Sequence, residues 1–539
     1  MTLIAVSIAV HSADQIDAAI ERASIALKSG ANLIEWRIDE LAQEPEALTA
    51  AAELVRRSPA PCIVTCRPDW EGGAYEGEER VRLELLHALM AAPDRPRYVD
   101  IELKSVQHDD VWAGNQSSIV SAVEKRDLQT SLIVSSHDFQ GRPRDLLQRI
   151  ESMTNEPACA VIKVAWLARS LRDNLEAFEL LRTRRKPMIA LCMGRFGLMS
   201  RVLAPKFGGF LTFATDTPTE VTAPGQPTID DLLRLYRFDR INPKTKVYGV
   251  IGWPVEHSLS PVIQNAGFEA VGHDGVYLPL PIPPEYEHFK ATVGALIDAL
   301  GLDFRGASVT IPHKENLLRF VRERGGRCDR LTERIGAANT LMVGSAGGLE
   351  CVNTDCPAAM QGLTAGMNID QKDLAGKKVA VIGAGGAARA IVIGLVDAGA
   401  LVTVFNRDQE RARKLVEDAA VAPEAASGGE TASASVGDPD ALTRGGFDVY
   451  INCTPIGMAG GPAPHESPLP ANVPLDENAT VFDTVYTPAR TPLIAEAEAR
   501  GARVISGMDM FIRQAAMQFE RWTGGVPPID VIKTALSRF

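Results

Sequence analysis

Short apolar runs rich in β-branched residues recur through the first 240 residues at an average spacing of about 30 residues, the length of one strand-helix unit. Amphipathic stretches of helical period separate them, as at 12–29, which opens on a serine and closes at Gly30. Eight strands alternating with helices predict a parallel (β/α)8 barrel. The runs are 3–10, 31–38, 61–66, 98–103, 131–136, 159–165, 187–193 and 209–214.

Polar residues stand where the predicted strands end, and the active sites of such barrels lie at the carboxyl ends of the strands. Several are arginines, and a group of guanidinium ions predicts an anionic substrate, most simply a carboxylate bound by a bidentate pair. In chain order these residues are Glu35, Arg37, Asp39, Arg67, Glu71, Asp100, Glu102, His137, Lys163, Arg201, Thr222 and Gln226.

Lys163 is the one charged residue of the sixth apolar run. Burial disfavours the charged form of an amine, so we expect this side chain to be partly neutral and nucleophilic. Such an amine attacks a ketone to form an imine. The alternatives are a lysine that extends to water, a structural ion pair of Glu35 with Arg37, and a hydrogen-bonded core histidine at His137. The convergence of these residues on one predicted barrel face favours a catalytic site over these structural alternatives.

Composition narrows the class of partner. The chain has 539 residues, which suggests about two to four domains, and its 45% hydrophobic and 23% charged content is typical of a folded protein. We expect a cytoplasmic protein, because no run could span a bilayer and no signal peptide is present. A net charge of -12 disfavours nucleic acid as the main partner.

Eight cysteines without a CxxC pair predict free thiols and no metal site. An oligomer is compatible with the sequence.

Six ordered motifs of the first 240 residues resemble type I 3-dehydroquinate dehydratase: Glu-x-Arg-x-Asp, Thr-x-Arg with Glu-Gly-Gly, Ser-x-His-Asp-Phe, Lys-Val-Ala, Ser-Arg and Ala-Pro-Gly-Gln. The resemblance implies that Lys163 forms an imine with the ring ketone of 3-dehydroquinate, and that His137 removes the adjacent proton and protonates the departing hydroxyl. It implies that Glu71 orients His137 and that Arg201 binds the substrate carboxylate. The remaining implied substrate-binding residues are Glu35, Arg37, Arg67, Gln226 and Thr222, which replaces the family's usual serine.

A glycine-rich segment in the second half, Gly383-Ala384-Gly385-Gly386-Ala387, directly follows an apolar strand predicted at 377–382. A turn of this kind between strand and helix lets backbone amides approach a pyrophosphate. The next predicted strand, 401–405, ends about 20 residues later, where the ribose is bound. The cations at this end favour a 2'-phosphate and hence NADP(H), while the neighbouring Asp408 leaves NAD as an alternative. The residues predicted to bind there are Asn406, Arg407 and Arg411.

Two further segments carry candidate binding groups. Lys314 follows an apolar run, as Lys163 does. Ser258 and Ser260 alternate at a predicted helix start, where hydroxyl and backbone donors can bind a carboxylate, although a simple N-cap explains them equally well.

Residues 245–539 resemble shikimate dehydrogenase through Ser-Leu-Ser-Pro, Val-Thr-Ile-Pro-His-Lys, Gly-Ala-Ala-Asn-Thr, Asn-Thr-Asp, the glycine loop, Asn-Cys-Thr-Pro-Ile-Gly-Met and Gly-Met-Asp-Met. The resemblance implies that Lys314 and Asp355 exchange the hydroxyl proton while hydride moves to or from the nicotinamide, and that Ser258 and Ser260 bind the ring carboxylate. The other implied residues are Thr310, Asn339 and Gln514 on the substrate hydroxyls, Tyr486 lining the site, and Thr454 and Gly507 on the cofactor.

The two resemblances together predict a bifunctional enzyme of aromatic amino-acid and chorismate biosynthesis. It would dehydrate 3-dehydroquinate through a Schiff base and reduce the 3-dehydroshikimate formed to shikimate with NADPH. The expected domains are a barrel at 1–240, an α/β shikimate-binding domain at 245–354 completed by 509–539, and a Rossmann NADP-binding domain at 355–508. The alternatives are an NAD-dependent quinate/shikimate dehydrogenase in the second half and a metabolite-sensing regulator without turnover.

Overall fold

The computed structural model describes residues 1–108, 118–124, 129–217, 225–420 and 433–538. The chain divides into two units. The first comprises residues 1–247, 274–282 and 292–303, and the second comprises 248–273, 283–291 and 304–539. No helix of the described ranges has the length and apolar content needed to cross a membrane.

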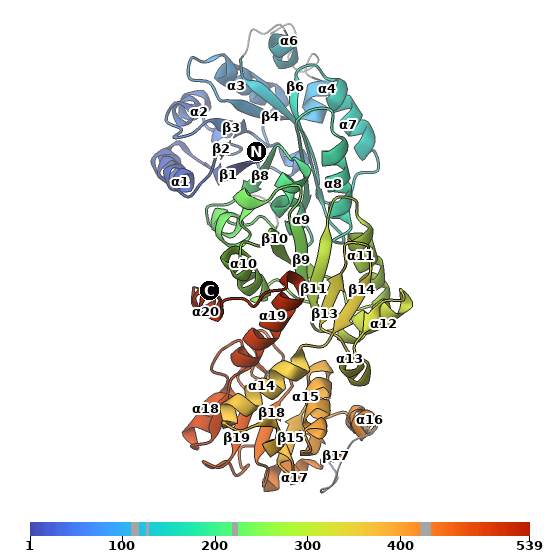
Figure 1. Ribbon diagram of the computed structural model, residues 1–539. Helices are drawn as coiled ribbons and strands as arrows, with labels where there is room; N and C mark the ends of the chain where they lie inside the picture. Colours follow the sequence, from blue (N-terminus) through green and yellow to red (C-terminus); the bar gives the residue numbers. More distant parts are fainter. Residues whose placement is uncertain (109–117, 125–128, 218–224, 421–432, 539) are drawn as a thin grey trace. The chain divides into compact units, whose positions relative to one another are not determined.

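Eight parallel strands form the sheet of the first unit, with helices around it (Figure 1). All eight predicted strands are present, so the predicted (β/α)8 architecture is confirmed. The hydrogen-bonded order is β7-β6-β5-β4-β3-β2-β1-β8, and Phe210, just before β8, donates its backbone N–H to the carbonyl of Met188 in β7 at 2.8 Å. The barrel is therefore nearly closed.

The strands of the barrel are β1 (Leu3–Ala9), β2 (Leu33–Arg37), β3 (Cys62–Thr65), β4 (Tyr98–Glu102), β5 (Ser131–Asp138), β6 (Cys159–Leu167), β7 (Met188–Met193) and β8 (Leu211–Ala214). The helices of this part of the chain are α1 (Ile16–Lys28), α2 (Ala47–Arg56), α3 (Glu79–Ala91), α4 (Leu103–Gln107), α6 (Ile119–Glu124), α7 (Leu146–Asn155), α8 (Asp173–Thr183) and α9 (Leu198–Val202).

The interior of the barrel changes from apolar to polar along the strands. Leu33 and Val161 belong to the apolar cluster inside the barrel. Two residues further along the same strands lie Glu35 and Lys163, which line the pocket at the carboxyl ends. Because side chains alternate across a strand, residues two apart share a face. One interior face thus supplies a core at its amino end and a polar site at its carboxyl end.

Helix α3 contains a fully buried arginine, Arg82. Its guanidinium donates to the carboxylate of Glu102 and to the backbone carbonyl of Cys66, each at 2.6 Å, and it also pairs with Glu79. A buried charge is strongly destabilising unless it is paired. Arg82 therefore fixes α3 to the carboxyl end of β4, where Glu102 lies.

The second unit contains two sheets. In one, β9 (Lys246–Gly252), β11 (Phe304–Val309), β13 (Thr340–Val343), β14 (Leu349–Val352) and β12 (Arg327–Cys328) lie in this order. The pairs of β13 with β11 and β14 are antiparallel, and β12 is parallel to β14. Between β9 and β11 the chain forms β10 (Gly275–Pro281) and α11 (Tyr286–Asp298).

The other sheet is parallel throughout and has the order β17-β16-β15-β18-β19-β20. Numbered along the chain, this is the doubly wound order of a Rossmann dinucleotide-binding sheet, so the predicted Rossmann architecture is confirmed. Its strands are β15 (Lys378–Ile382), β16 (Leu401–Phe405), β17 (Ser433–Val436), β18 (Val449–Asn452), β19 (Thr480–Asp483) and β20 (Arg503–Ile505). The direction of winding reverses between β15 and β18, where such sheets bind their ligand.

One long helix, α19 (Gly507–Thr523), follows the Rossmann sheet and packs on β11 and β13 of the first sheet. The other helices of the second unit are α10 (Ser260–Ala270), α12 (Lys314–Glu323), α13 (Arg330–Ile335), α14 (Asp355–Met367), α15 (Gly386–Asp397), α16 (Gln409–Ala420), α17 (Pro439–Arg444), α18 (Pro492–Ala499) and α20 (Ile529–Leu536).

The burial of Arg82 predicts a large effect on stability. Arg82→Met should lower the free energy of unfolding of the first unit by about 3 kcal/mol, because it removes one cation from the buried Glu102. Arg80→Met is the matched control on the same helix, since Arg80 pairs with Glu84 at the surface and that pair contributes less than about 1 kcal/mol. Pulse proteolysis in urea measures both variants. Equal losses from the two substitutions would contradict the expected role of Arg82.

Candidate active sites

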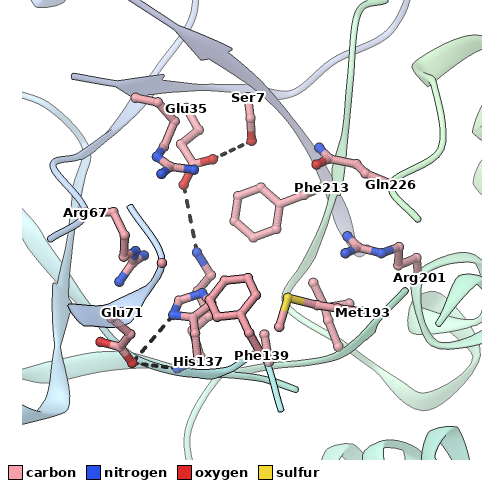
Figure 2. A pocket seen from close by; sticks show the side chains of 15 residues that line it. Ser7, Glu35, Arg67, Glu71, His137, Phe139, Met193, Arg201, Phe213 and Gln226 are labelled. Atoms are coloured by element: carbon pink, nitrogen blue, oxygen red, sulfur yellow. Dashed lines mark hydrogen bonds and ion pairs between the residues drawn. The ribbon is translucent and has the colours of Figure 1, made fainter. Parts of the chain in front are cut away.

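A pocket opens at the carboxyl ends of the barrel strands and contains the residues predicted for the first site (Figure 2). Thr222 lies outside the described residues, and every other residue that the family resemblance assigned to this site lines the pocket, whereas Asp39, Asp100 and Glu102 do not. The lining residues are Ser7, Glu35, Arg37, Arg67, Glu71, Gly72, His137, Phe139, Lys163, Ala165, Leu191, Met193, Arg201, Phe213 and Gln226.

Lys163 projects from β6 into this pocket and is 5% exposed. Its Nζ lies 2.7 Å from Oδ2 of Asp100 and 3.8 Å from Oε1 of Glu35, and it lies over the ring of Phe213 at 4.4 Å from the centroid. The sequence predicted a partly neutral amine from burial alone. The structure adds two carboxylates beside this amine, and its neutral form stays a prediction.

Arg67 joins the two carboxylates of β4. Its guanidinium lies 2.9 Å from Asp100 and 2.6 Å from Glu102, and both carboxylates are fully buried. Burial opposes ionisation of Asp100, but Arg67 and Lys163 outweigh it and hold the pKa of Asp100 well below its usual range. Ser135 completes the group by donating its hydroxyl to Asp100 at 2.5 Å. Asp100 therefore stays an anion that can accept a cation at Lys163.

His137 and Glu71 lie next to each other in the pocket that contains the amine of Lys163. The carboxylate of Glu71 accepts the backbone N–H of His137 at 2.6 Å and lies 3.7 Å from Nδ1 of the ring. Burial, with Arg67 and Lys163 nearby, holds the pKa of His137 well below its usual range, so the imidazole is neutral. Burial also raises the pKa of Glu71 to about 7. The pair is a base beside a carboxyl that titrates near neutrality.

The turn that carries Glu71 depends on a glycine. A Cβ on Gly73 would lie 2.0 Å from the backbone oxygen of Arg67, so the chain can fold back on itself only without a side chain there. The close return places Glu71 next to β5 and His137. The Glu-Gly-Gly turn thus positions the carboxylate of Glu71.

Arg201 lies across the pocket from Arg67 and Glu71 (Figure 2). It is 2% exposed, and its Nε and Nη1 have no hydrogen-bond partner among the residues that the structure describes. Burial lowers the pKa of Arg201 to about 10. A buried guanidinium without a carboxylate is strongly disfavoured unless a ligand supplies one. Arg201 therefore offers a buried cation to an anionic ligand, and its role in binding the substrate stays a prediction.

Glu35 and Arg37 each have a fixed partner. Glu35 accepts hydroxyl hydrogen bonds from Ser7 and, at 2.9 Å, from Thr65. Arg37 pairs with Asp39 at 2.7 Å. The alternative of a direct Glu35–Arg37 ion pair is thus not the arrangement found.

The sequence missed the contacts that organise the pocket. Asp100 and Glu102 were placed on the strand from their alternation but were given no role. The pairing of Asp100 with Lys163 joins β4 to β6 across β5, which the sequence of any one strand does not reveal. Phe213 was read as part of an apolar strand, and its ring covers the amine.

The second candidate site centres on Lys314 and Asp355. Lys314 begins α12, Asp355 begins α14, and their side chains pair with Nζ 2.6 Å from Oδ2. The other carboxylate oxygen accepts from Nδ2 of Asn339 at 2.9 Å. The side chains of Lys314 and Asp355 are 15% and 8% exposed, so the pair is largely shielded from water yet accessible.

Two of the residues predicted to bind substrate, Asn339 and Thr310, lie near this pair, and Tyr486 and Gln514 share a neighbour in Phe511. Val309, next to Thr310, donates its backbone N–H to the carbonyl of Asn339 at 2.7 Å, which brings Thr310 beside Asn339. Tyr486 stacks on Phe511 with ring centroids 4.3 Å apart, and Gln514 donates to the carbonyl of Phe511 at 3.1 Å.

The two serines lie at the start of α10. Ser258 accepts the backbone N–H of Ser260 through its hydroxyl at 3.3 Å. Leu259 between them packs on the same apolar cluster as Tyr486. The fold thus brings the serines, Tyr486 and Gln514 together around α10 and α19.

The glycine loop has the geometry of a dinucleotide site. It leaves β15 at the switch point, and Gly383 adopts a φ of 115° with its Cα close to the carbonyl of Cys453, which precedes Thr454. Helix α15 begins at Gly386 without a side-chain cap, and no atom lies within 4 Å of where a Cβ on Gly385 would be. Uncapped amides and open backbone fit a diphosphate. Lys314 approaches Gly386, since a Cβ there would lie 3.3 Å from its Cδ.

The segment predicted to bind the ribose of the cofactor follows β16. Asp408 accepts the backbone N–H groups of Glu410 and Arg411 at 3.1 and 3.2 Å, and its other oxygen lies 3.8 Å from Nε of Arg411. Asn406 donates to the carbonyl of Asp408 at 2.8 Å. Asp408 therefore occupies two backbone amides at the start of α16 and lies beside Arg411, one of the two arginines predicted to bind a 2'-phosphate.

Close packing explains why residue 507 is a glycine. A Cβ at this position would lie 2.5 Å from the carbonyl of Val485, so the start of α19 approaches the end of β19 closely. The sequence predicted that Gly507 approaches the nicotinamide, and that role stays a prediction.

Family models match successive segments of the chain. A model described as type I 3-dehydroquinase matches residues 4–243, and one for the shikimate dehydrogenase substrate-binding domain matches residues 250–341. A shikimate/quinate 5-dehydrogenase model matches residues 365–427, and a shikimate 5'-dehydrogenase C-terminal domain matches residues 507–536.

Individual relatives agree with these models. Shikimate dehydrogenases (NADP(+)) of Methanocella arvoryzae and Methanothermobacter thermautotrophicus are 42% and 39% identical over 53% and 55% of this chain, and the matches cover 96% and 98% of those proteins. A chloroplastic bifunctional 3-dehydroquinate dehydratase/shikimate dehydrogenase of Arabidopsis thaliana is 37% identical over 98% of this chain and 83% of its own length. Because that match runs through both halves, the chain belongs to the family of bifunctional 3-dehydroquinate dehydratase/shikimate dehydrogenases.

Proposed function

We propose that the barrel pocket dehydrates 3-dehydroquinate through an imine on Lys163, and that the site at Lys314 and Asp355 reduces the resulting 3-dehydroshikimate to shikimate. The observation that carries the first assignment is that one pocket contains a buried amine, a neutral imidazole and an unpartnered guanidinium. These groups match the ketone, the acidic C–H bond and the carboxylate of the substrate. The two reactions are successive steps of shikimate formation.

The first step forms a carbon–nitrogen bond. Lys163 must lose a proton before it attacks the ketone, and the neutral His137 in the same pocket is a base that can accept it. The amine then adds to the ketone carbon, and the oxygen leaves as water with one hydrogen from the amine nitrogen and the proton that His137 had accepted, which returns His137 to its neutral form. The iminium that remains is a cation, and Asp100 stabilises it as it stabilised the ammonium.

The second step breaks carbon–hydrogen and carbon–oxygen bonds. Electrons left when the carbon next to the iminium loses its proton delocalise onto nitrogen, which lowers the barrier. His137 removes that proton and then gives a proton to the departing hydroxyl, which leaves as water. Hydrolysis of the imine returns the free amine of Lys163. Arg201 holds the substrate carboxylate, and Glu71 orients His137 through its backbone and ring.

Separate replacement of the two lysines tests whether the sites are independent. Lys163→Met should abolish dehydration, a loss of at least about a thousandfold in kcat, and leave reduction of 3-dehydroshikimate unchanged, because Lys163 is the one lysine among the described residues that line the pocket. Lys104→Met is the control, since Lys104 is an exposed lysine of the same unit outside the pocket lining. Both activities are followed on one preparation of each variant. Residual dehydration within about tenfold of the parent would refute the assignment of Lys163.

The pKa of Glu71 predicts how stability depends on pH. The folded state raises this pKa from 4.5 to about 7, so it binds the proton more tightly than the unfolded chain does. The stabilisation is full below about pH 4.5 and is lost as the pH rises to about 7. Glu71→Gln cannot ionise and should be more stable than the parent above about pH 7, by up to about 3 kcal/mol.

Urea unfolding by pulse proteolysis at about pH 5 and about pH 8 measures the difference. Glu84→Gln is the control for loss of an exposed carboxylate from the same unit. If the gain from Glu71→Gln were the same at both pH values, the buried carboxyl would not titrate as described.

The second site transfers a proton alongside a hydride. When bound, NADPH supplies the hydride that reduces the ketone carbon. Lys314 donates a proton to the ketone oxygen as it becomes a hydroxyl, and the adjacent Asp355 keeps the ammonium protonated and directed. Ser258 and Ser260 bind the ring carboxylate, and Thr310, Asn339 and Gln514 bind its hydroxyls, with Tyr486 lining the site. The open amides at Gly385 and Gly386 accommodate the cofactor diphosphate.

NADP(H) is the cofactor that relatives of the second half support, since their names specify NADP(+). NAD-dependent quinate oxidation is therefore not favoured. Arg407 and Arg411 are the cations available to a 2'-phosphate, and Asp408 reduces their effect by occupying Arg411 and two amides. We propose 355–508 as the cofactor domain, 245–354 with 509–539 as the substrate domain, and 1–240 as the dehydratase; the cytoplasmic location stays a prediction.

The position of Asp408 predicts a gain from its removal. Asp408→Asn should lower the KM for NADPH by up to about fivefold and change the KM for NADH little, because an exposed ionic contact contributes up to about 1 kcal/mol. Glu410→Gln is the matched control, which removes the same charge two residues away from a pair with Arg413. Steady-state reduction of 3-dehydroshikimate with each cofactor measures both. Parallel changes for NADPH and NADH would exclude a contact of Asp408 with the 2'-phosphate.

A further inference from the structure

Gln518 is a buried glutamine in α19, and it lies outside the sequence motifs described for the second half of the chain. Its side chain is 1% exposed, and both ends are hydrogen-bonded. Oε1 accepts the hydroxyl of Ser308 at 2.6 Å, while Nε2 donates to the backbone carbonyl of Asn339 and to Oγ1 of Thr340, each at 3.1 Å. The amide of Gln518 thus contacts the ends of β11 and β13 next to the second site.

The hydrogen bonds beyond Gln518 have a fixed direction. A hydroxyl has one hydrogen to donate, and Oγ1 of Thr340 already accepts from Gln518. Its hydrogen is therefore free to be donated to Oδ1 of Asn339, at 2.9 Å. The backbone N–H of Thr354 donates to the same oxygen at 2.8 Å. The hydroxyl of Thr354 donates to it as well, at 3.2 Å, so three donors on Oδ1 hold the amide of Asn339 in one orientation.

That orientation decides what faces the reacting carboxylate. Because Oδ1 of Asn339 is turned toward Thr340 and Thr354, Nδ2 is turned toward Asp355 and donates to its Oδ1 at 2.9 Å. The other oxygen of Asp355 receives Lys314 at 2.6 Å. A reversed amide would place an oxygen against the carboxylate and repel it. The relay Gln518–Thr340–Asn339–Asp355 therefore fixes the geometry of the proton-donating pair.

We propose that Gln518 is a positioning residue for the reduction: through Thr340 it fixes the amide of Asn339, which holds Asp355 in register with Lys314. The proposal rests on the proposed role of Lys314 and Asp355. Gln518 lies four residues after Gln514, so both face the same side of α19. The helix that carries a substrate-binding amide also carries the amide that aligns the catalytic pair.

A purely structural Gln518 would behave differently from a positioning one. A structural residue stabilises the fold, and its replacement lowers stability without a selective effect on chemistry. A positioning residue alters the rate of proton delivery in a folded protein whose affinity for substrate and cofactor is preserved. The two roles separate in the split between kcat and KM, with the dehydratase of the same chain as an internal control.

Gln518→Glu is the direct test, since an ionised carboxylate has the same shape and only accepts hydrogen bonds. The hydrogen of Thr340 then turns toward residue 518, and Oδ1 of Asn339 loses one of its three donors, the one that Gln518 directs. We expect the kcat for reduction of 3-dehydroshikimate to fall at least about tenfold, with each KM within about threefold of the parent and dehydration unchanged. The solvent deuterium isotope effect on kcat should rise, because proton delivery becomes slower.

Thr340 provides a second test that introduces no charge. Thr340→Val removes the hydroxyl and should lower kcat as Gln518→Glu does, whereas Thr340→Ser keeps the hydroxyl and should restore kcat to within about threefold of the parent. In the double variant the two losses should be less than additive, because both act on one relay. If Gln518→Glu does not fold, the Thr340 pair decides the question.

The outcomes separate this inference from the proposed function. Unchanged kcat in folded Gln518→Glu or Thr340→Val overturns the relay, as does an equal loss in Thr340→Ser or a loss confined to KM or stability. Lys314→Met tests the function itself and should abolish reduction. Full reduction by Lys314→Met would refute the catalytic pair, whereas an inactive Lys314→Met with a normal Gln518→Glu would refute only the positioning role.

Discussion

Two buried carboxylates inside the barrel, Asp100 and Glu102, are paired with arginines, and the first site depends on these ion pairs. Arg67 bridges both, and Arg82 supports Glu102 from α3. Without these cations the carboxylates would be expensive to bury, and without Asp100 the ammonium of Lys163 would be as well. The polar end of the barrel is therefore one connected set of charges, and the catalytic amine is its last member rather than an isolated buried lysine.

Both sites pair a lysine with an aspartate, yet they use the pair in opposite ways. Lys163 shares its pocket with the neutral His137, to which it can lose a proton and become a nucleophile. Lys314 is held against Asp355, whose second oxygen is fixed by Asn339, and in the proposed reduction it donates a proton. The neighbouring groups, rather than the lysines themselves, set the difference between imine chemistry and proton donation.

The sequence predicted the architecture because its signals are local: alternation along each strand and a glycine turn between a strand and a helix. It also placed Lys163 and His137 on one barrel face for the same reason. It did not predict contacts that depend on how distant segments pack. The partner of Lys163 comes from β4 across an intervening strand, and Gln518 bonds to Asn339 over 179 residues of chain. The sequence predicted the burial of this amine but not the carboxylates beside it.

The most direct test of this account is to trap the imine. Borohydride added with 3-dehydroshikimate should reduce the iminium to a stable secondary amine, and peptide mass spectrometry should find the added mass of the ligand on the peptide that contains Lys163. Dehydration should be lost in proportion to labelling, while reduction measured after borohydride is removed persists. Label on a different lysine, or complete labelling of Lys163 with full dehydratase activity, would contradict the central claim that this amine, paired with Asp100, carries the reaction.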